Sequence, residues 1–395
     1  MTVQPLDELT DAQRDLVERA RTIAQNDLRP RAAEWDRRQE FPEDSFQILR
    51  RAGFTGLTVP VEYGGQGLGV FEACLVLEEL AAGCMASAMS IQMQVNGPPR
   101  VISRLGTEAH KKKYLTEVAD GSTRFSIAMT EPQAGSDGTA LATTLTEDGD
   151  GFRLNGTKCH ITGAASAHAF LVFCRAADTT GPDGIGAVLV HAGVEGLGPI
   201  ETEEKMGGRG VAEGIMHFEN TPVRADQVLM KPVKGSKEGA AFLVRQFNPE
   251  RCGNAAMSIG VARAALEDAI VYVKQREQFG RSILEFQGIQ WKIADMATEL
   301  DAARLLLWRA ARTDIDGFPG MKETLMAKLF ANEMAVRVCN EAIQLLGHKG
   351  YLTRYPMERY FRDARGLGIG GGTTEILRNM ISGEVTGVRV SQRRR

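Results

Sequence analysis

The sequence predicts a mainly α-helical protein with a β domain inserted between two helical parts. Three observations along its 395 residues predict this order. Residues 6–120 carry apolar side chains at helical spacing, residues 123–232 break into short apolar runs between polar turns, and helical spacing returns from Ser236. The expected domains are therefore 1–122, 123–234 and 235–395.

The first helical part is expected to contain at least three helices. Residues 12–26 repeat apolar side chains at the spacing of one helix face. Pro42 and Gly53 flank residues 44–52 as a start and a stop signal for a short helix. Residues 70–81 are apolar nearly all round, which predicts a helix that is buried on every side.

The middle part is expected to be built from strands. Compact apolar runs predict buried strands at 125–129, 169–174 and 185–191. Turn residues at 147–151 are followed by a short alternating segment and then by Asn155-Gly156. Because Asn-Gly favours the left-handed backbone of tight turns, this dipeptide predicts a β-hairpin at 155–156.

Helical patterning in the last part predicts three long helices, at about 237–275, 285–314 and 320–346. Polar and glycine-containing segments at 278–280 and 316–320 separate them. Small residues at 260–266 suit close helix packing. Pro249, inside the first of these helices, predicts a bend or the start of a new helix.

Composition excludes several classes of protein. The net charge is −3 with 25% charged and 43% hydrophobic residues, which is ordinary for a globular protein and gives no basic excess for a nucleic-acid partner. The basic run 393–395 reads as a frayed tail. No apolar stretch of about 18 residues predicts a membrane span, and the N-terminus has no secretory pattern. Six scattered cysteines without a CxxC indicate reduced thiols, so a cytoplasmic location is expected.

Two familiar site patterns are absent and one is misleading. The six histidines have no metal-ligand spacing and there is no Gly-x-Ser-x-Gly, so no metal site and no serine nucleophile is predicted. Residues 366–371 match GxGxxG, but residues 356–364 before them read as a helix, whereas a dinucleotide fingerprint follows a strand. A glycine-rich loop that lies against a ligand explains this segment better.

Four segments carry the functional signal: 127–137, 276–281, 344–351 and 362–376. From its residues alone, the first is a strand that ends in a polar loop, and it either holds a planar hydrogen-bonding cofactor or is only a turn. Each of the others, taken alone, reads as a helix end or a solvated loop.

In their order, Thr130-Glu131-Pro132-x-Ala134-Gly135-Ser136-Asp137 and Arg276-x-Gln278-Phe279-Gly280 resemble the acyl-CoA dehydrogenase family. The resemblance runs from Glu62-Tyr63-Gly64-Gly65 to the last helix. It implies an N-terminal helical domain, a β-barrel-like middle domain and a C-terminal four-helix bundle. It also implies FAD as cofactor, an acyl-CoA substrate, a homotetramer built as a dimer of dimers, and electron transfer flavoprotein as the electron acceptor.

The resemblance also implies a set of FAD contacts. They are Ile127, Met129, Thr130, Gly135, Ser136, His160, Ile161, Thr162, Arg276, Gln278, Phe279, Gln287, Gln344, Gly347, His348, Thr373 and Glu375. Residues 127–130 would hold the flavin ring, and Arg276 would reach the pyrophosphate across a dimer interface. Many relatives have Trp at the position of His160, Gly at that of His348 and Gln at that of Glu375.

The catalytic base is the point at which this sequence departs from the commonest family pattern. That position falls on Gly371, which has no side chain but whose N–H can still donate to the thioester oxygen. A subset that includes isovaleryl and long-chain types carries the base in a Glu-Arg motif on a C-terminal-domain helix, and Pro249-Glu250-Arg251 matches it. Glu250 is therefore the predicted base. The alternative is that Glu250 is a solvated helix residue beside Arg251 with no catalytic role. The expected substrate contacts are Ser136, Asn248, Arg251, Gly371 and Gly372.

The chemistry that the resemblance implies is removal of the α proton with transfer of the β hydrogen as hydride to flavin N5, which gives a 2-enoyl-CoA. Because an α proton is a poor acid, the site needs preformed donors to the thioester oxygen and a carboxylate with a raised pKa. Acyl-CoA desulfinases and enoyl-CoA reductases of the same fold are the first alternative, although a desulfinase has no need of a base at Glu250. A catalytically silent DNA-associated flavoprotein is the second, and the net charge counts against it.

Overall fold

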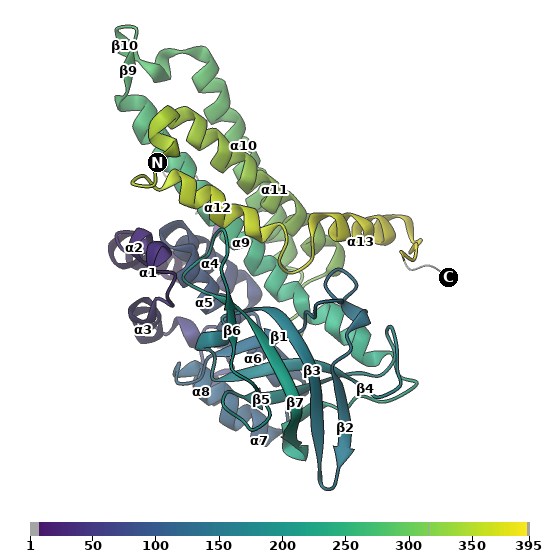
Figure 1. The fold of residues 1–395 in the computed structure, drawn as a ribbon. Helices are drawn as coiled ribbons and strands as arrows, with labels where there is room; N and C mark the ends of the chain where they lie inside the picture. The colour runs from purple at the N-terminus through teal and green to yellow at the C-terminus, as the bar shows by residue number, and fades with distance from the viewer. Residues whose placement is uncertain (1–7, 315, 393–395) are drawn as a thin grey trace.

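The computed structural model describes residues 8–314 and 316–392. The terminal arginine run 393–395 and most of the N-terminal segment inspected for a secretory signal lie outside these residues. Figure 1 shows a β domain at one end of the molecule, N-terminal helices beside it and a long helical bundle that extends to the other end. Among the described residues, no helix has the length and apolar character that a membrane crossing requires.

Helices are the regular elements in the described residues of the N-terminal part. They are α1 (Asp11–Ile23), α2 (Ala32–Arg38), α3 (Glu43–Arg51), α4 (Val70–Gly83), α5 (Met85–Val95), α6 (Pro98–Leu105), α7 (Glu108–His110) and α8 (Thr116–Ala119). The three helices expected from sequence are present as α1, α3 and α4. Thr10 explains where α1 begins, because its hydroxyl accepts from the Gln13 N–H while the Gln13 side chain accepts from the Thr10 N–H. Helix α4 is buried nearly all round, as its apolar composition predicts.

The middle part is an eight-stranded sheet in the order β6-β7-β3-β2-β4-β5-β8, with β1 paired to β4. The strands are β1 (Phe125–Ala128), β2 (Thr144–Asp148), β3 (Gly151–Thr162), β4 (Ala169–Ala176), β5 (Ile185–His191), β6 (Glu201–Glu203), β7 (Glu213–Arg224) and β8 (Val228–Met230). Alternate residues of β4 enter different apolar clusters: Leu171 and Phe173 pack in one, and Phe170 and Val172 in the other. The strand is covered on both faces, which is why its sequence is a continuous apolar run.

The hairpin predicted at Asn155-Gly156 is wrong. The turn between β2 and β3 lies at 148–151, and Asn155-Gly156 sits inside β3, where the pairing with β7 shifts register. Gly156 has φ +150°, and a Cβ there would lie 2.4 Å from the hydroxyl oxygen of Thr143. Asn-Gly indicates a backbone conformation that favours glycine. In this strand the cause is a β-bulge and the close approach of Thr143, not a turn.

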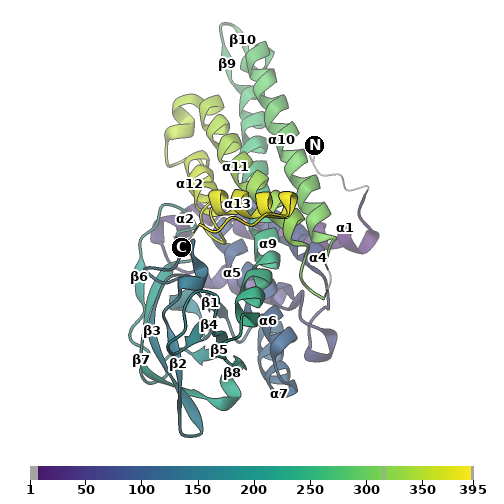
Figure 2. The same ribbon diagram turned by 90° about the vertical axis from the view of Figure 1, so that its right-hand side faces the viewer.

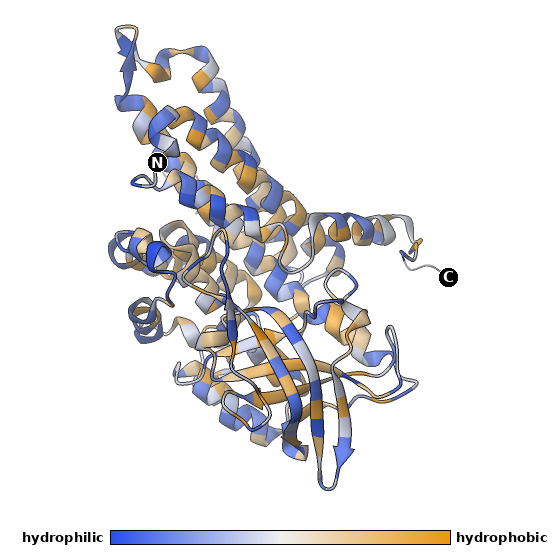
Figure 3. Cartoon of the chain, viewed as in Figure 1, coloured by the Kyte–Doolittle hydropathy of each residue, from blue (hydrophilic) through white to orange (hydrophobic). Residues whose placement is uncertain are grey.

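The C-terminal part contains α9 (Glu238–Gln275), a short hairpin of β9 (Glu277–Gln278) and β10 (Arg281–Ser282), α10 (Gln287–Ala311), α11 (Met321–Leu346), α12 (Met357–Leu367) and α13 (Thr374–Thr386). Helix α9 continues through Pro249, so the proline starts no new helix. A Cβ at Gly260 would lie 2.2 Å from the carbonyl oxygen of Glu78, so this glycine lets α9 approach α4 closely. Apolar and hydrophilic residues alternate along these helices (Figure 3), and the buried apolar ones pack in one core cluster.

A buried cluster of charges joins the N-terminal helices to the bundle. Arg304 on α10 donates to the Glu78 carboxylate at 2.9 Å, and Arg263 on α9 donates to Glu79 at 2.8 Å. Arg21 on α1 also donates to Glu79, at 3.0 Å. All five side chains are at most 11% exposed, so each charge depends on its partners instead of on water.

Candidate active site

The glycine-rich loop between α12 and α13 meets α9 beside the β domain (Figures 1 and 2). Arg251 on α9 makes the connection, because its Nε donates to the carbonyl oxygen of Gly371 at 3.2 Å. The segment before this loop is helix α12, so the GxGxxG sequence does not follow a strand. The fold therefore brings the helix that carries Glu250, the predicted base, into contact with the loop that carries Gly371, the predicted donor to the thioester oxygen.

Glu250 occupies the adjacent position of α9. Its Oε1 atom is buried and has no hydrogen-bond partner among the described residues. Burial raises the pKa of Glu250 to about 8, and the positive charge of Arg251 opposes this rise only in part. The main chain is fixed at this point, since the Gln92 side chain on α5 donates to the Glu250 carbonyl oxygen at 3.0 Å. A carboxylate of raised basicity on a rigid helix is what proton abstraction from carbon requires.

Arg251 is held from several sides. Its Nη1 donates to Asn248 Oδ1 at 3.0 Å and to the Val244 carbonyl oxygen at 3.3 Å, while Asn248 donates to the Pro319 carbonyl oxygen at 2.8 Å. Burial lowers the pKa of Arg251 to about 10, with the Glu250 charge acting in the other direction, so the guanidinium remains a cation at neutral pH. Asn248 is thus a support for Arg251, and its amide is already committed to protein partners.

The loop itself requires glycine at its end. Gly371 has φ +70° and Gly372 has φ +101°, both in the region that L side chains rarely adopt. Sequence reasoning missed the residue beneath them, Lys328 on α11. A Cβ at Gly371 would lie 3.5 Å from its Cε, and its ammonium donates to the Gly372 carbonyl oxygen at 3.0 Å. A lysine inside the otherwise apolar stretch 325–331 was the available signal.

A second buried lysine organises the polar loop that follows β1. Lys158 on β3 donates to the Met129 carbonyl oxygen at 2.9 Å and to Glu131 at 2.7 Å. The Glu131 carboxylate also accepts from the Thr143 hydroxyl at 2.6 Å, and the opposing charge of Lys158 contributes to the lowered pKa of Glu131, against its desolvation. The Cys159 N–H donates to the Thr130 carbonyl oxygen at 2.9 Å. The carbonyl groups of this loop are thus turned toward the protein.

The outer side of the same loop is open. Within the described residues, the hydroxyls of Thr130, Ser136 and Thr162 make no hydrogen bond, and a Cβ at Gly135 would meet nothing within 4 Å. Free hydroxyls beside an uncovered glycine fit a flat ring with hydrogen-bonding atoms on its edge. Ile127 and Met129 are partly buried and pack against the core beneath the loop.

The segment 160–162 presents its residues differently. His160 is exposed, has φ +55°, and its N–H and Nδ1 lie 3.1 and 2.9 Å from Glu203 Oε2. The Ile161 side chain is 2% exposed in the β core, so only its backbone is available to a ligand.

His160, Glu203 and Glu213 each place a potential metal-ligand atom within 4.8 Å of the others. Lys205 already lies 3.5 Å from Glu213, which supports an ion-pair network at this place.

The remaining predicted FAD contacts lie elsewhere. Arg276, Gln278, Phe279 and Gln287 are exposed at the tip of the α9–α10 hairpin, where Phe279 is 93% exposed. The tip lies at the end of the bundle farthest from the β domain (Figure 1). Gln344, Gly347 and His348 are exposed at the end of α11. One chain therefore does not bring these residues together with the loop after β1.

Two further predicted contacts begin α13. Thr373 caps this helix by accepting from the Ile376 N–H at 3.3 Å. Glu375 is exposed in the first turn and accepts from the Thr374 hydroxyl at 3.1 Å. Helix N-termini attract anionic groups such as phosphates, which the Glu375 carboxylate disfavours.

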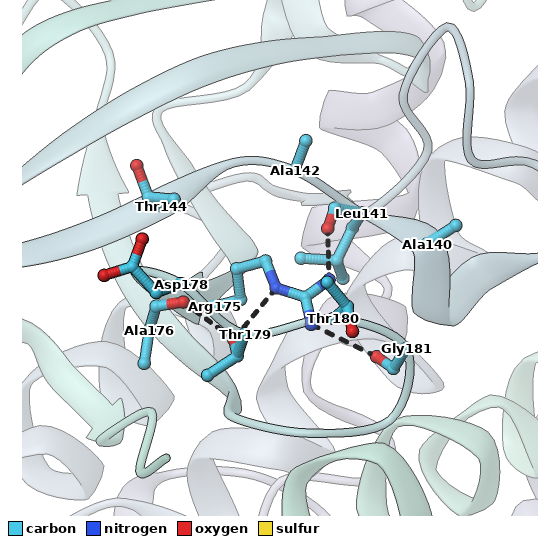
Figure 4. A pocket seen from close by; sticks show the side chains of 10 residues that line it. All are labelled: Ala140, Leu141, Ala142, Thr144, Arg175, Ala176, Asp178, Thr179, Thr180 and Gly181. Carbon is cyan, nitrogen blue, oxygen red and sulfur yellow. Dashed lines mark hydrogen bonds between the residues drawn. The ribbon is translucent and has the colours of Figure 1, made fainter.

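A surface hollow of about 430 Å³ lies in the β domain (Figure 4). The Arg175 side chain occupies its floor and donates to the carbonyl oxygens of Leu141 and Asp183 at 2.6 and 3.0 Å. No residue predicted for catalysis or cofactor binding lines it. The hollow and the Glu250 site are therefore separate.

Known proteins resemble this chain over almost its whole length. Family models described as "Acyl-CoA dehydrogenase" N-terminal, middle and C-terminal domains match residues 10–122, 126–221 and 237–386. A 3-sulfinopropanoyl-CoA desulfinase of Paraburkholderia xenovorans is 40% identical over 98% of this chain and 99% of its own length. An acryloyl-CoA reductase (NADH) of Anaerotignum propionicum is 38% identical over 95% of each chain. The butyryl-CoA dehydrogenase structure from Megasphaera elsdenii superposes with a TM-score of 0.91 at 33% identity, over 96% of this chain and 99% of the other.

Proposed function

The chain belongs to the acyl-CoA dehydrogenase family, and from this premise we propose that it oxidises an acyl-CoA thioester between the α and β carbons with Glu250 as the base. It is an enzyme that acts on acyl-CoA, and its cofactor is FAD. The observation that carries the proposal is the buried, unpartnered Glu250 Oε1, whose pKa is raised to about 8 next to the Arg251–Gly371 contact.

Each part of the site has a task in this reaction. Glu250 accepts the α proton, and the N–H groups of Gly371 and Gly372 donate to the thioester oxygen, where negative charge develops. Arg251 holds the loop at a fixed position relative to Glu250. Its Nη2 makes no hydrogen bond within the described residues and is available to the CoA moiety. FAD, when bound, accepts the β hydrogen as hydride.

Two copies of the chain are needed for a complete cofactor site. The loop after β1 offers the hydroxyls of Thr130 and Ser136, whereas Arg276 and Phe279 lie at the far end of the bundle. We place the tip of one copy against the β domain of another, in a homotetramer built as a dimer of dimers. Electron transfer flavoprotein is the proposed acceptor of the electrons.

The pH dependence follows from Glu250. Because burial raises its pKa to about 8, the free carboxyl is largely protonated at neutral pH and becomes a base as the pH rises. We expect kcat/KM to increase from pH 6 to 9 through an apparent pKa near 8, which a steady-state pH profile measures. A profile that is flat over this range would remove Glu250 from the role of base.

Lys158 should govern cofactor retention. In Lys158→Met the Glu131 carboxylate keeps its burial but loses its cation, so the loop after β1 should loosen and the variant should purify with less than about half the wild-type FAD. The ratio of flavin to protein absorbance measures this. Lys231→Met is the control, because Lys231 pairs with Glu147 on the surface of the same domain. Equal FAD content in both variants would contradict the role given to Lys158.

Desulfination of a sulfinated acyl-CoA is the second candidate function. The similarity to a named desulfinase over nearly the whole chain favours it. Against it, a desulfinase has no need of a base at Glu250, whereas dehydrogenation uses a carboxyl group of raised pKa at this position.

Anaerobic mixing with an acyl-CoA panel separates these candidates. Straight-chain, branched, aromatic and sulfinated acyl-CoAs would be mixed with the FAD-loaded enzyme while the absorbance of oxidised flavin is followed. We expect rapid bleaching with one unsulfinated class and a 2-enoyl-CoA product. Sulfite release without bleaching would establish desulfination instead, and reoxidation of reduced enzyme by an enoyl-CoA with no forward bleaching would establish reduction.

A further inference from the structure

The Lys328 side chain is fully buried beneath the glycine-rich loop. Its ammonium donates to Asn332 Oδ1 at 3.0 Å, to the Leu367 carbonyl oxygen at 3.2 Å and to the Gly372 carbonyl oxygen at 3.0 Å. Leu367 is the last residue of α12, and Gly372 lies just before the cap of α13. All three N–H bonds of one ammonium are therefore used, and two of them tie together the two ends of the loop.

Further polar side chains extend this contact into a network. Asn254 on α9 donates to the same Leu367 carbonyl oxygen at 3.3 Å. Asn332 donates to Asn254 Oδ1 at 2.7 Å and to the Ser258 hydroxyl at 2.6 Å. With Arg251 on the Gly371 carbonyl oxygen, side chains of α9 and α11 hold three carbonyl groups of the loop.

A lysine is a costly way to fill this space. Burial, together with the nearby positive charge of Arg251, lowers the pKa of Lys328 to about 7. No carboxylate forms an ion pair with it within the described residues. A methionine would fill a similar volume without these costs. The ammonium is instead hydrogen-bonded to carbonyl oxygens. One of them lies at the C-terminal end of a helix, where a positive charge is favoured.

We propose that Lys328 is a positioning residue, which fixes the loop 367–372 so that the Gly371 N–H faces the thioester oxygen while Glu250 takes the α proton. That the oxygen belongs to a thioester rests on the proposed function. That Lys328 fixes the loop rests on its three hydrogen bonds. Gly371 and Gly372 adopt positive φ and have no side chains of their own, so the loop depends on outside groups to hold one conformation. Lys328 supplies those contacts at both ends.

The test compares Lys328→Met with Cys339→Ala in the FAD-loaded enzyme. Cys339 lies on the same helix and is equally buried, but it is placed in the apolar core and makes no hydrogen bond to the loop among the described residues. Hydrogen exchange of peptides that cover 366–374 should be at least about tenfold faster in Lys328→Met and unchanged in Cys339→Ala. Turnover should fall by about 10²-fold, the scale of losing one oxyanion donor.

A ligand experiment separates positioning from general damage. Acetoacetyl-CoA, a 3-oxoacyl thioester that is not dehydrogenated, is the probe. Its enolate requires a polarised carbonyl group and gives a long-wavelength band against oxidised flavin. Lys328→Met should bind this probe with less than about fivefold weaker affinity by calorimetry but show a much weaker band. Lys328→Gln, which retains an N–H donor group, should recover part of both the band and the exchange protection.

Unchanged exchange over 366–374 in Lys328→Met, or a full enolate band, would overturn the proposal. If Lys328→Met does not fold, Lys328→Gln with Asn254→Leu takes its place, and the same exchange result is required. If no acyl-CoA reduces the wild-type enzyme, the proposed function fails. The exchange comparison would still decide whether Lys328 holds the loop.

Discussion

Glu250→Gln should reduce the flavin about 10²- to 10⁴-fold more slowly than the wild-type enzyme when mixed anaerobically with a substrate acyl-CoA. The amide keeps the shape of the side chain but cannot accept the α proton. Affinity for the acyl-CoA should change little, because Arg251 and the loop around Gly371 are untouched. Stopped-flow absorbance gives the rate, and titration with the product enoyl-CoA gives the affinity.

Glu238→Gln is the matched control, since Glu238 lies on the same helix and is exposed. Stability provides a second check on Glu250→Gln. A buried carboxyl with a raised pKa favours the folded state least once the pH exceeds that pKa, here about 8, because the folded protein then holds an unpaired charge. The variant should therefore be at least as stable as wild type at pH 9. A rate equal to that of the control would exclude Glu250 as the base.

Arg304→Met should lower the free energy of unfolding by about 3–5 kcal/mol, the range for breaking a buried ion pair. Arg304 is fully buried and donates to Glu78 at 2.9 Å. Arg263 also lies near Glu78, with its Nε 3.3 Å from the carboxylate. The variant removes the Arg304 cation from a carboxylate that is 1% exposed and has little access to water. Urea denaturation of the FAD-loaded protein measures the change.

Arg337→Met serves as the control for this prediction. Arg337 pairs with Glu299 at 2.8 Å, but both side chains are at least one-third exposed. Loss of a surface pair should cost about 1 kcal/mol or less. Similar costs in the two variants would mean that the cluster between α1, α4, α9 and α10 is not what joins the N-terminal helices to the bundle.

The fold class was readable from sequence because local patterns agree with tertiary burial. Helix α4 is apolar and buried nearly all round, and β4 is a continuous apolar run covered on both faces. The errors in the predicted fold come from sequence signals that two different local structures can produce. Asn155-Gly156 marks a bulge instead of a turn, and Pro249 lies within one continuous helix. The domain boundaries after residues 122 and 234 stay predictions.

The candidate site was only partly accessible to sequence reasoning. Glu250-Arg251 was found because both residues sit in one short motif, and its catalytic role, like the other assigned site roles, remains a prediction. Lys328 was missed because its partners, Leu367 and Gly372, lie about forty residues further along the chain. Lys158 was missed for a similar reason, since its partners follow a different strand. A lysine within an apolar run is the one local sign that such contacts leave.

Exchange of the α hydrogen in deuterated water tests the central claim most directly. A 3-thia-acyl-CoA analogue, which has an acidic α position but no carbon at the β position to oxidise, would be incubated with the FAD-loaded enzyme and analysed by mass spectrometry. We predict deuterium incorporation at the α carbon with the wild-type enzyme and none above background with Glu250→Gln. Equal incorporation with both enzymes would show that another group removes the proton, and the account given for Glu250 would be wrong.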